Sequence, residues 1–116
     1  MSGGHLAFVI PTDPTKAPQQ VTVCGLEELQ KRVGGYIQFI PVDRPDVALY
    51  CNEEGKIHGL APNPRATAAF RRYLSEGDYL AGPVVVAGQD PDTGDLIDLP
   101  EDVQKTFRFI VEEVFA

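Results

Sequence analysis

The sequence predicts a single α+β domain over residues 1–116, in which a mainly antiparallel, twisted sheet of a meander plus hairpins carries about three helices. Short runs rich in Val, Ile, Phe and Tyr are separated by turn residues, and 10 prolines and 11 glycines keep these elements short. Three other segments repeat apolar residues at spacings of three and four, which indicates helices. The length is that of one domain with one core.

The N-terminal part predicts a wide hairpin followed by a helix. The runs "HLAFVIP" (5–11) and "VTVC" (21–24) are typical strands, and the proline-bearing segment 12–20 between them is expected to be a mobile loop. The helix is expected over 25–35. It has acidic residues in its first turn and basic residues in its last, as the helix dipole favours, and the pair Gly34–Gly35 ends it.

The middle of the chain predicts a meander and a second helix. The runs "YIQFIPV" (36–42), "VALYC" (47–51) and "KIHGL" (56–60) are expected to be consecutive strands joined by turns. Asn63 before Pro64 is typical of an N-cap with proline at the first helical position. The buried face of that helix is expected to contain Ala66, Ala69, Phe70, Tyr73 and Leu74.

The C-terminal part predicts a buried strand, a hairpin and a last helix. Three valines, 84–86, mark the strand within 78–88, and a turn at 90–95 leads to a short strand at 96–99. The turn sequence "DPDTGD" has the wrong order of carboxylates for a calcium loop. After Pro100 the last helix is expected to bury the stripe Val103, Phe107, Ile110 and Val114.

The composition argues against nucleic acid and membranes as partners. A net charge of −7 opposes general nucleic-acid binding, which depends on Lys and Arg neutralising phosphates. The N-terminus lacks the basic start and long apolar run of a signal peptide, and no segment approaches the ~18 apolar residues that cross a bilayer. We therefore expect a cytoplasmic protein with no membrane contact, in which Cys24 and Cys51 stay reduced.

Basic residues on the second helix suggest a site for a small anionic ligand such as a nucleotide or phosphate compound. A helical wheel places Arg65 and Arg72 on one outward side, beside a helix N-terminus capped by Asn63, and Lys56 precedes them. Arginine suits phosphate and carboxylate groups. The favoured alternative is a solvated helix face, where exposed charge is the rule.

Metal and catalytic sites have little support. His5, Cys24, Cys51 and His58 are spaced unlike the paired ligands of structural zinc sites, so no metal and no cofactor is expected. No nucleophile motif or converging acid–base pair is visible, and no catalytic residue is assigned. The prediction leans against an enzyme, although a hydrolase of unknown type stays as an alternative.

Two aromatic residues fall outside the stripe of the last helix. Phe109 and Phe115 are candidates for an interface with a protein partner or with a second copy in a homodimer. The alternative is a wider buried face in a small domain.

Three segments resemble a small family of uncharacterised domains. "VGGYIQFI" (33–40), "LYCNEEGKIHGLAPNPRAT" (49–67) and "GDYLAGPVVVAG" (77–88) are similar to the domain of unknown function 3846 of bacteria, their phages and plasmids. The resemblance implies no activity and no catalytic residue. It implies an accessory role in a phage, plasmid or bacterial genome, exercised by binding. The leading hypothesis is therefore a small binding protein that acts by protein–protein interaction.

Overall fold

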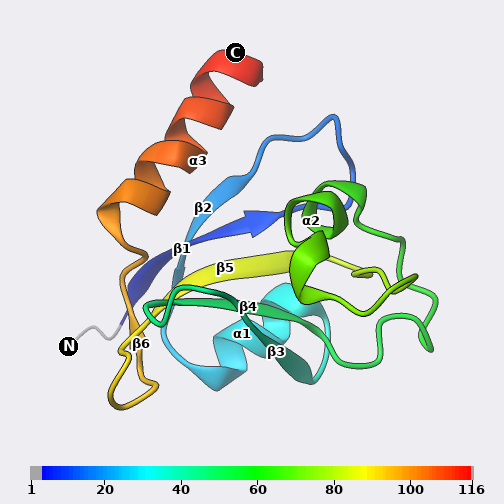
Figure 1. The fold of residues 1–116 in the computed structure, drawn as a ribbon, viewed down its shortest axis with the longest axis horizontal. Coiled ribbons are helices and arrows are strands. Elements are labelled where there is room, and N and C mark those ends of the chain that lie inside the picture. The colour runs from blue at the N-terminus through cyan, green and yellow to red at the C-terminus, as the bar shows by residue number, and fades with distance from the viewer. Residues whose placement is uncertain (1–3, 116) are drawn as a thin grey trace.

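The computed structural model describes residues 4–115 and confirms the α+β class. Six strands form one antiparallel sheet, and the helices pack on its two faces (Figure 1). The strands are β1 (His5–Ile10), β2 (Gln19–Val23), β3 (Ile37–Pro41), β4 (Val47–Asn52), β5 (Val84–Gln89) and β6 (Leu96–Ile97). The helices are α1 (Leu26–Val33), α2 (Pro64–Ala69), the 3₁₀ turn η1 (Arg71–Tyr73) and α3 (Glu101–Val114).

The order of the strands places a late strand at the centre of the sheet. The order is β2-β1-β5-β4-β3, and β6 pairs with Gly88 and Gln89 of β5, beyond the residues of β5 that pair with β1. Val86 of β5 lies opposite Phe8 of β1 on one side and Leu49 of β4 on the other. The hairpins β1–β2, β3–β4 and β5–β6 follow from the sequence, and β5 joins the first two. β5 is accordingly buried along most of its length.

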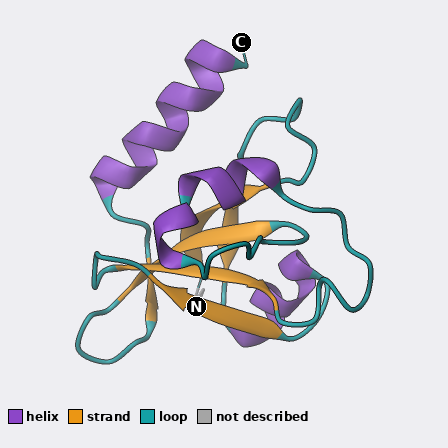
Figure 2. Cartoon of the chain, turned by 45° about the vertical axis from the view of Figure 1, so that its right-hand side comes forward, coloured by secondary structure: helices purple, strands orange, loops and turns teal. Residues whose placement is uncertain are grey.

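One face of the sheet is covered by α1, as Figure 2 shows. Leu29 and Val33 of this helix are buried on small side chains of the sheet, including Ala7, Val85 and Ala87. The helix ends where Gly34 adopts φ 83°, a left-handed conformation that glycine accepts without strain. The predicted helix is therefore confirmed, with its acidic and basic turns in place.

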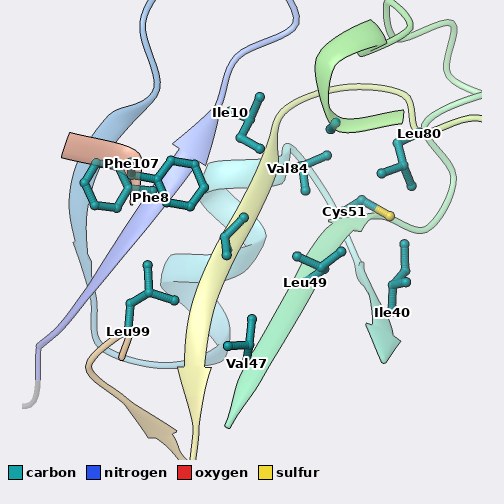
Figure 3. Close-up of a cluster of buried hydrophobic side chains, with 12 residues drawn as sticks. Phe8, Ile10, Ile40, Val47, Leu49, Cys51, Leu80, Val84, Leu99 and Phe107 are labelled. Carbon is teal, nitrogen blue, oxygen red and sulfur yellow. The ribbon is translucent and has the colours of Figure 1, made fainter. Parts of the chain in front are cut away.

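The other face contains the larger hydrophobic cluster. Phe8 of β1 stacks on Phe107 of α3, with ring centroids 4.7 Å apart and planes 9° from parallel (Figure 3). Ala66 of α2, Leu49 of β4 and Leu99 before α3 belong to the same cluster. α3 takes part through Phe107, which is buried, and Val103, which is partly buried against the cluster. Its other buried residue is Gln104. The C-terminal end of α3 extends away from the strands (Figures 1 and 2).

The prediction of a strand at 56–60, as the third strand of a meander, is wrong. These residues form turns, in which the amide of His58 donates to the carbonyl of Glu54 and that of Leu60 to the carbonyl of Gly55. Both edges of β4 are already paired, with β3 and β5, so the segment has no place beside it. Ile57 is consequently 80% exposed.

Three other boundaries differ from the prediction. The second helix ends at Ala69, because Phe70 adopts a non-helical conformation and a 3₁₀ turn follows. β2 begins at Gln19, inside the segment expected to be a loop, and β5 begins only at Val84. The buried face predicted for the second helix forms only in part. Ala66 is buried, and Phe70, Tyr73 and Leu74, in and beside η1, are partly buried against the core, but Ala69 is exposed.

Candidate functional site

An apolar groove lies on the face of the sheet opposite α1. It runs between α3 on one side and α2 with η1 on the other, and the loop from β1 to β2 closes one end. Its volume is about 600 Å³. It is lined by Ile10, Pro14, Pro18, Val42, Arg44, Val47, Arg65, Ala69, Phe70, Tyr73, Val86, Val103, Thr106, Phe107, Ile110, Val114 and Phe115. We call this feature the α3 groove.

The α3 groove follows from the way α3 sits on the sheet. The predicted stripe of α3 does face inward, and all four of its residues line the groove. Only Phe107 is buried, however, while Val114 is 66% exposed. α2 ends at Ala69, and the C-terminal end of α3 extends away from the strands, so apolar side chains such as that of Val114 remain open to solvent (Figure 1). A binding site of this kind favours a ligand with an apolar surface.

Arg44, in the turn between β3 and β4, is paired with two carboxylates. Arg44 donates to Asp46 from Nε and Nη2, both at 3.0 Å, and its Nη1 lies 2.5 Å from Asp102 of α3. The hydrogen bonds from Arg44 lower the pKa of Asp46 and of Asp102, and the two carboxylates raise the pKa of Arg44. These bonds fasten the first turn of α3 to the loop before β4 and leave Arg44 little capacity for another anion.

The arginine at the other end of the groove has no carboxylate partner within residues 4–115. One terminal nitrogen of Arg65 donates to the backbone oxygens of Pro11 and Asp13, each at 3.0 Å. Its Nε is buried without a hydrogen-bond partner in the described chain. The guanidinium lies 5.5 Å from the ring centroid of Phe115, a cation–π arrangement. Within the described residues, Arg65 thus lies beside an apolar surface as a cation that interacts with the charge of Asp13 but forms no ion pair with a carboxylate.

Asn63, predicted as an N-cap, is confirmed in that role. It is fully buried, and its side-chain oxygen accepts from the amide of Ala66 at 3.1 Å. Its side-chain nitrogen donates to the carbonyls of Ile10 and Gly82. The amide therefore joins the end of β1, the start of α2 and the segment before β5, and has no hydrogen left for a ligand.

The remaining predicted ligand residues lie apart from Arg65. Arg72 belongs to η1 rather than to α2, so it no longer shares a helix face with Arg65. Its Nη2 lies 2.7 Å from Asp43. Lys56 forms an ion pair with Asp78 at a second hollow, described below. The structure thus places these side chains at separate positions, and their role in binding an anion stays a prediction.

The two aromatic residues predicted at an interface also separate. Phe115 is half-buried and lines the α3 groove. Phe109 is 64% exposed and lies on another side of α3, because two residues correspond to about 200° around a helix and Phe107 faces the core. Their role in an interface stays a prediction, but one surface of α3 cannot present both.

The histidines and cysteines do not gather. Cys51 is buried in the larger cluster, where burial raises the pKa of its thiol to about 11, whereas Cys24 is exposed beyond β2. His5 lies 3.7 Å from Asp98, and His58 lies 3.5 Å from Glu54. Within residues 4–115, no three side chains of His, Cys, Asp or Glu form a group that could hold a metal ion.

Sequence reasoning did not identify the α3 groove. It assigned Val114 and Ile110 to a buried stripe, and it treated Pro14 and Pro18 only as loop residues. A signal was present in the last turn of α3, where Glu112 and Glu113 stand without a basic residue. The helix dipole favours cations there, so this pattern differs from that of α1 and could have indicated an unfinished helix end.

Comparison with known proteins places the chain in a family. The model of the domain of unknown function DUF3846 matches residues 6–111, which is most of the chain. The chain belongs to the DUF3846 family. Membership confirms the resemblance seen in the middle of the sequence and extends it from β1 to α3. No curated protein and no solved structure matches the chain. None of the helices within residues 4–115 is long and apolar enough to cross a membrane.

Proposed function

We propose that this protein acts by protein–protein association and that two copies pair through the α3 groove. The observation that carries the proposal is an open groove of about 600 Å³ lined almost entirely by apolar side chains. Exposed apolar patches rimmed by polar groups mark interaction surfaces on otherwise monomeric proteins. In an acidic chain of 116 residues such a surface costs solubility unless another surface covers it.

The packing of α3 supports a helical occupant. An isolated helix of this length is marginal in water, and packing of one face normally stabilises it. α3 has 14 residues but buries only Gln104 and Phe107. The side chains of Ile110 and Val114 continue the same stripe toward the free end of the helix. The matching stripe of a second α3 would cover them, since helices pack by placing side-chain ridges into grooves.

Charge supports a second copy as the occupant. Glu113 lies three and seven residues after Ile110 and Thr106, which line the groove, so it borders the same side of α3. It forms no ion pair within residues 4–115, and it lies at a helix end that favours a cation. Within the described residues, Arg65 is a cation that forms no ion pair with a carboxylate at that end of the groove. In a two-fold pair, Arg65 of each copy meets Glu113 of the other, so the contact occurs twice.

The decisive experiment measures mass in solution against protein concentration. We expect the wild-type chain to sediment as a dimer that dissociates on dilution. Val114→Glu should weaken pairing by at least about tenfold, or about 1.4 kcal/mol, because it places a charge in the apolar contact. Phe109→Glu is the matched control, since both side chains are about two-thirds exposed on the same helix. It should pair as the wild type does.

A charge exchange tests the orientation. Arg65→Glu should weaken pairing, and Arg65→Glu combined with Glu113→Arg in the same chain should restore it, because the symmetry re-creates both ion pairs. Thermal unfolding of each variant checks that the fold is retained. A wild-type chain that stays monomeric at its highest soluble concentration contradicts the proposal. Loss of pairing in Phe109→Glu but not in Val114→Glu also contradicts it and moves the interface to the outer side of α3.

A further inference from the structure

A second hollow lies where three separate segments of the chain meet. Residues 38–41 of β3, residues 51–57 at the end of β4 and the turn after it, and residues 73–81 before β5 enclose about 400 Å³. These segments overlap the three stretches, 33–40, 49–67 and 77–88, whose sequences resemble the DUF3846 family. Tyr73 borders both this hollow and the α3 groove, but the other side chains that line the hollow are its own.

The side chains around the hollow favour a cation. Its charged residues are three carboxylates, Glu53, Glu54 and Asp78, and one base, Lys56. Three aromatic rings also line it, those of Phe39, Tyr73 and Tyr79. Carboxylates together with aromatic faces are the groups that recognise organic ammonium ions. An anionic ligand, which Lys56 alone suggests, would meet an excess of negative charge there.

Lys56 itself occupies this environment. Its ammonium forms an ion pair with Asp78 and lies 4.4 Å from the ring centroid of Tyr79. The same carboxylate oxygen of Asp78 accepts a hydrogen bond from the amide of Tyr79 at 2.8 Å, which holds the acid in place. The hydrogen bond from Lys56 lowers the pKa of Asp78, so the acid is an anion at neutral pH. The chain thus holds an alkylammonium group of its own against a fixed carboxylate and a ring.

We propose that the hollow is a binding site for a small amine whose alkylammonium group takes the place of the ammonium of Lys56. The exchange is feasible because Lys56 and Asp78 are both partly exposed, and exposed ion pairs contribute little to stability. Lys56 has a flexible side chain that can turn to solvent, whereas Asp78 is fixed to the backbone. The ligand gains the contacts with Asp78 and Tyr79, and Glu53 and Glu54 add long-range attraction.

The experiment is a titration with cadaverine, a diamine, followed by the amide NMR shifts of Tyr79 and Glu54. Lys56→Met should strengthen binding roughly two- to fivefold, the fold-change that corresponds to an exposed ion pair, because it removes the internal competitor. Lys31→Met is the matched control. It removes the same charge from α1, away from the hollow, and should bind cadaverine as the wild type does. Asp78→Asn should abolish the shifts.

The controls separate this site from general attraction to an acidic protein. A pentanediol of the same length as cadaverine, which has no charge, should cause no shifts. Tyr79→Leu should weaken cadaverine binding without affecting the fold, since Tyr79 is exposed. Equal affinity of Lys56→Met and Lys31→Met overturns the proposal. Unchanged binding by both Asp78→Asn and Tyr79→Leu overturns it as well.

Discussion

The two longer helices, α1 and α3, lie on opposite faces of the sheet and differ in how their ends and their apolar faces are stabilised. α1 has only 8 residues, yet it has acids in its first turn, bases in its last, a glycine at its end, and two apolar residues buried on the sheet. α3 has 14 residues, an acidic first turn, no base in its last turn, and no buried residue after Phe107. Within residues 4–115, the shorter helix therefore has its end charges, its C-cap and its apolar face satisfied, whereas the last turns of the longer helix do not.

This difference has a simple physical meaning. Helices in proteins depend on packing of an apolar face more than on their own propensity. α1 satisfies this need with Leu29 and Val33, whose neighbours on the sheet are small enough to let the helix approach closely. Within residues 4–115, no part of the chain buries the apolar stripe in the second half of α3. The apolar face of α3 that stays exposed is therefore the surface that is available to bind a partner.

The largest expected effect is the loss of stability when a buried residue of α1 is truncated, compared with a partly buried residue of α3. Leu29→Ala should lower the free energy of unfolding by about 2–5 kcal/mol, as truncation of a buried leucine usually does. Ile110→Ala should lower it by less than about 1 kcal/mol in dilute protein, because Ile110 is only partly buried. Urea unfolding of both variants provides the comparison. Equal losses would show that α3 packs as firmly as α1.

A smaller effect is expected at the end of α1. Gly34→Ala should lower the free energy of unfolding by about 1–2 kcal/mol, because alanine is strained in the left-handed conformation that ends the helix. Gly25→Ala, just before the same helix, is the control. Its backbone is extended, and no atom lies within 4 Å of an added Cβ. Similar unfolding midpoints for the two variants would contradict the role assigned to Gly34.

The smallest effect concerns the first turn of α3, where an ion pair adds to the packing of Val103 and Gln104. Hydrogen bonds from Arg44 lower the pKa of Asp46 and Asp102 below the usual 3.8. A lowered pKa stabilises the fold above the pKa of the unfolded chain, and this stabilisation is lost as pH falls through the folded pKa. Arg44→Gln should therefore be less stable than wild type at pH 7, and the difference should shrink below about pH 4.

Denaturant unfolding at neutral and acidic pH measures this difference. Lys31→Gln serves as the control, since it removes a charge from α1 that forms no ion pair within residues 4–115. Its difference from the wild type should be small and should change little with pH. A difference for Arg44→Gln that stays constant with pH would contradict the role assigned to the two aspartates.

Local rules predicted those elements whose signals are complete within the element. α1, the Asn63 cap and the hairpin β1–β2 follow from capping residues, charge order and alternation. The segment 56–60 failed because its apolar residues fit a strand locally, while the only neighbouring strand, β4, is paired on both edges. Whether a strand forms depends on a free neighbouring edge. β5 occupies the second edge of β4, and it lies nearly 30 residues further along the chain, so the local sequence cannot show that this edge is taken.

The candidate site was predicted only in fragments. The stripe of α3 and the basic residue Arg65 were both identified, but nothing local shows that Arg65 lies beside Phe115, which is far away in the sequence. The pairing of Lys56 with Asp78 is hidden for the same reason, since 22 residues separate them. The exposure of Val114 was not predicted either, because its place in the apolar stripe indicates burial, and α2 ends sooner than its apolar pattern indicates.

The position of β5 also has a consequence during synthesis of the chain. Within the sheet, the hairpins β1–β2 and β3–β4 are joined by hydrogen-bonded pairing only through β5, which occupies its middle. A nascent chain that has left the ribosome as far as residue 83 therefore holds two separate ribbons, each with an unsatisfied edge. We expect these ribbons to remain apart until the three valines of β5 emerge and join them, so that stalled or truncated products ending before this strand are prone to aggregate.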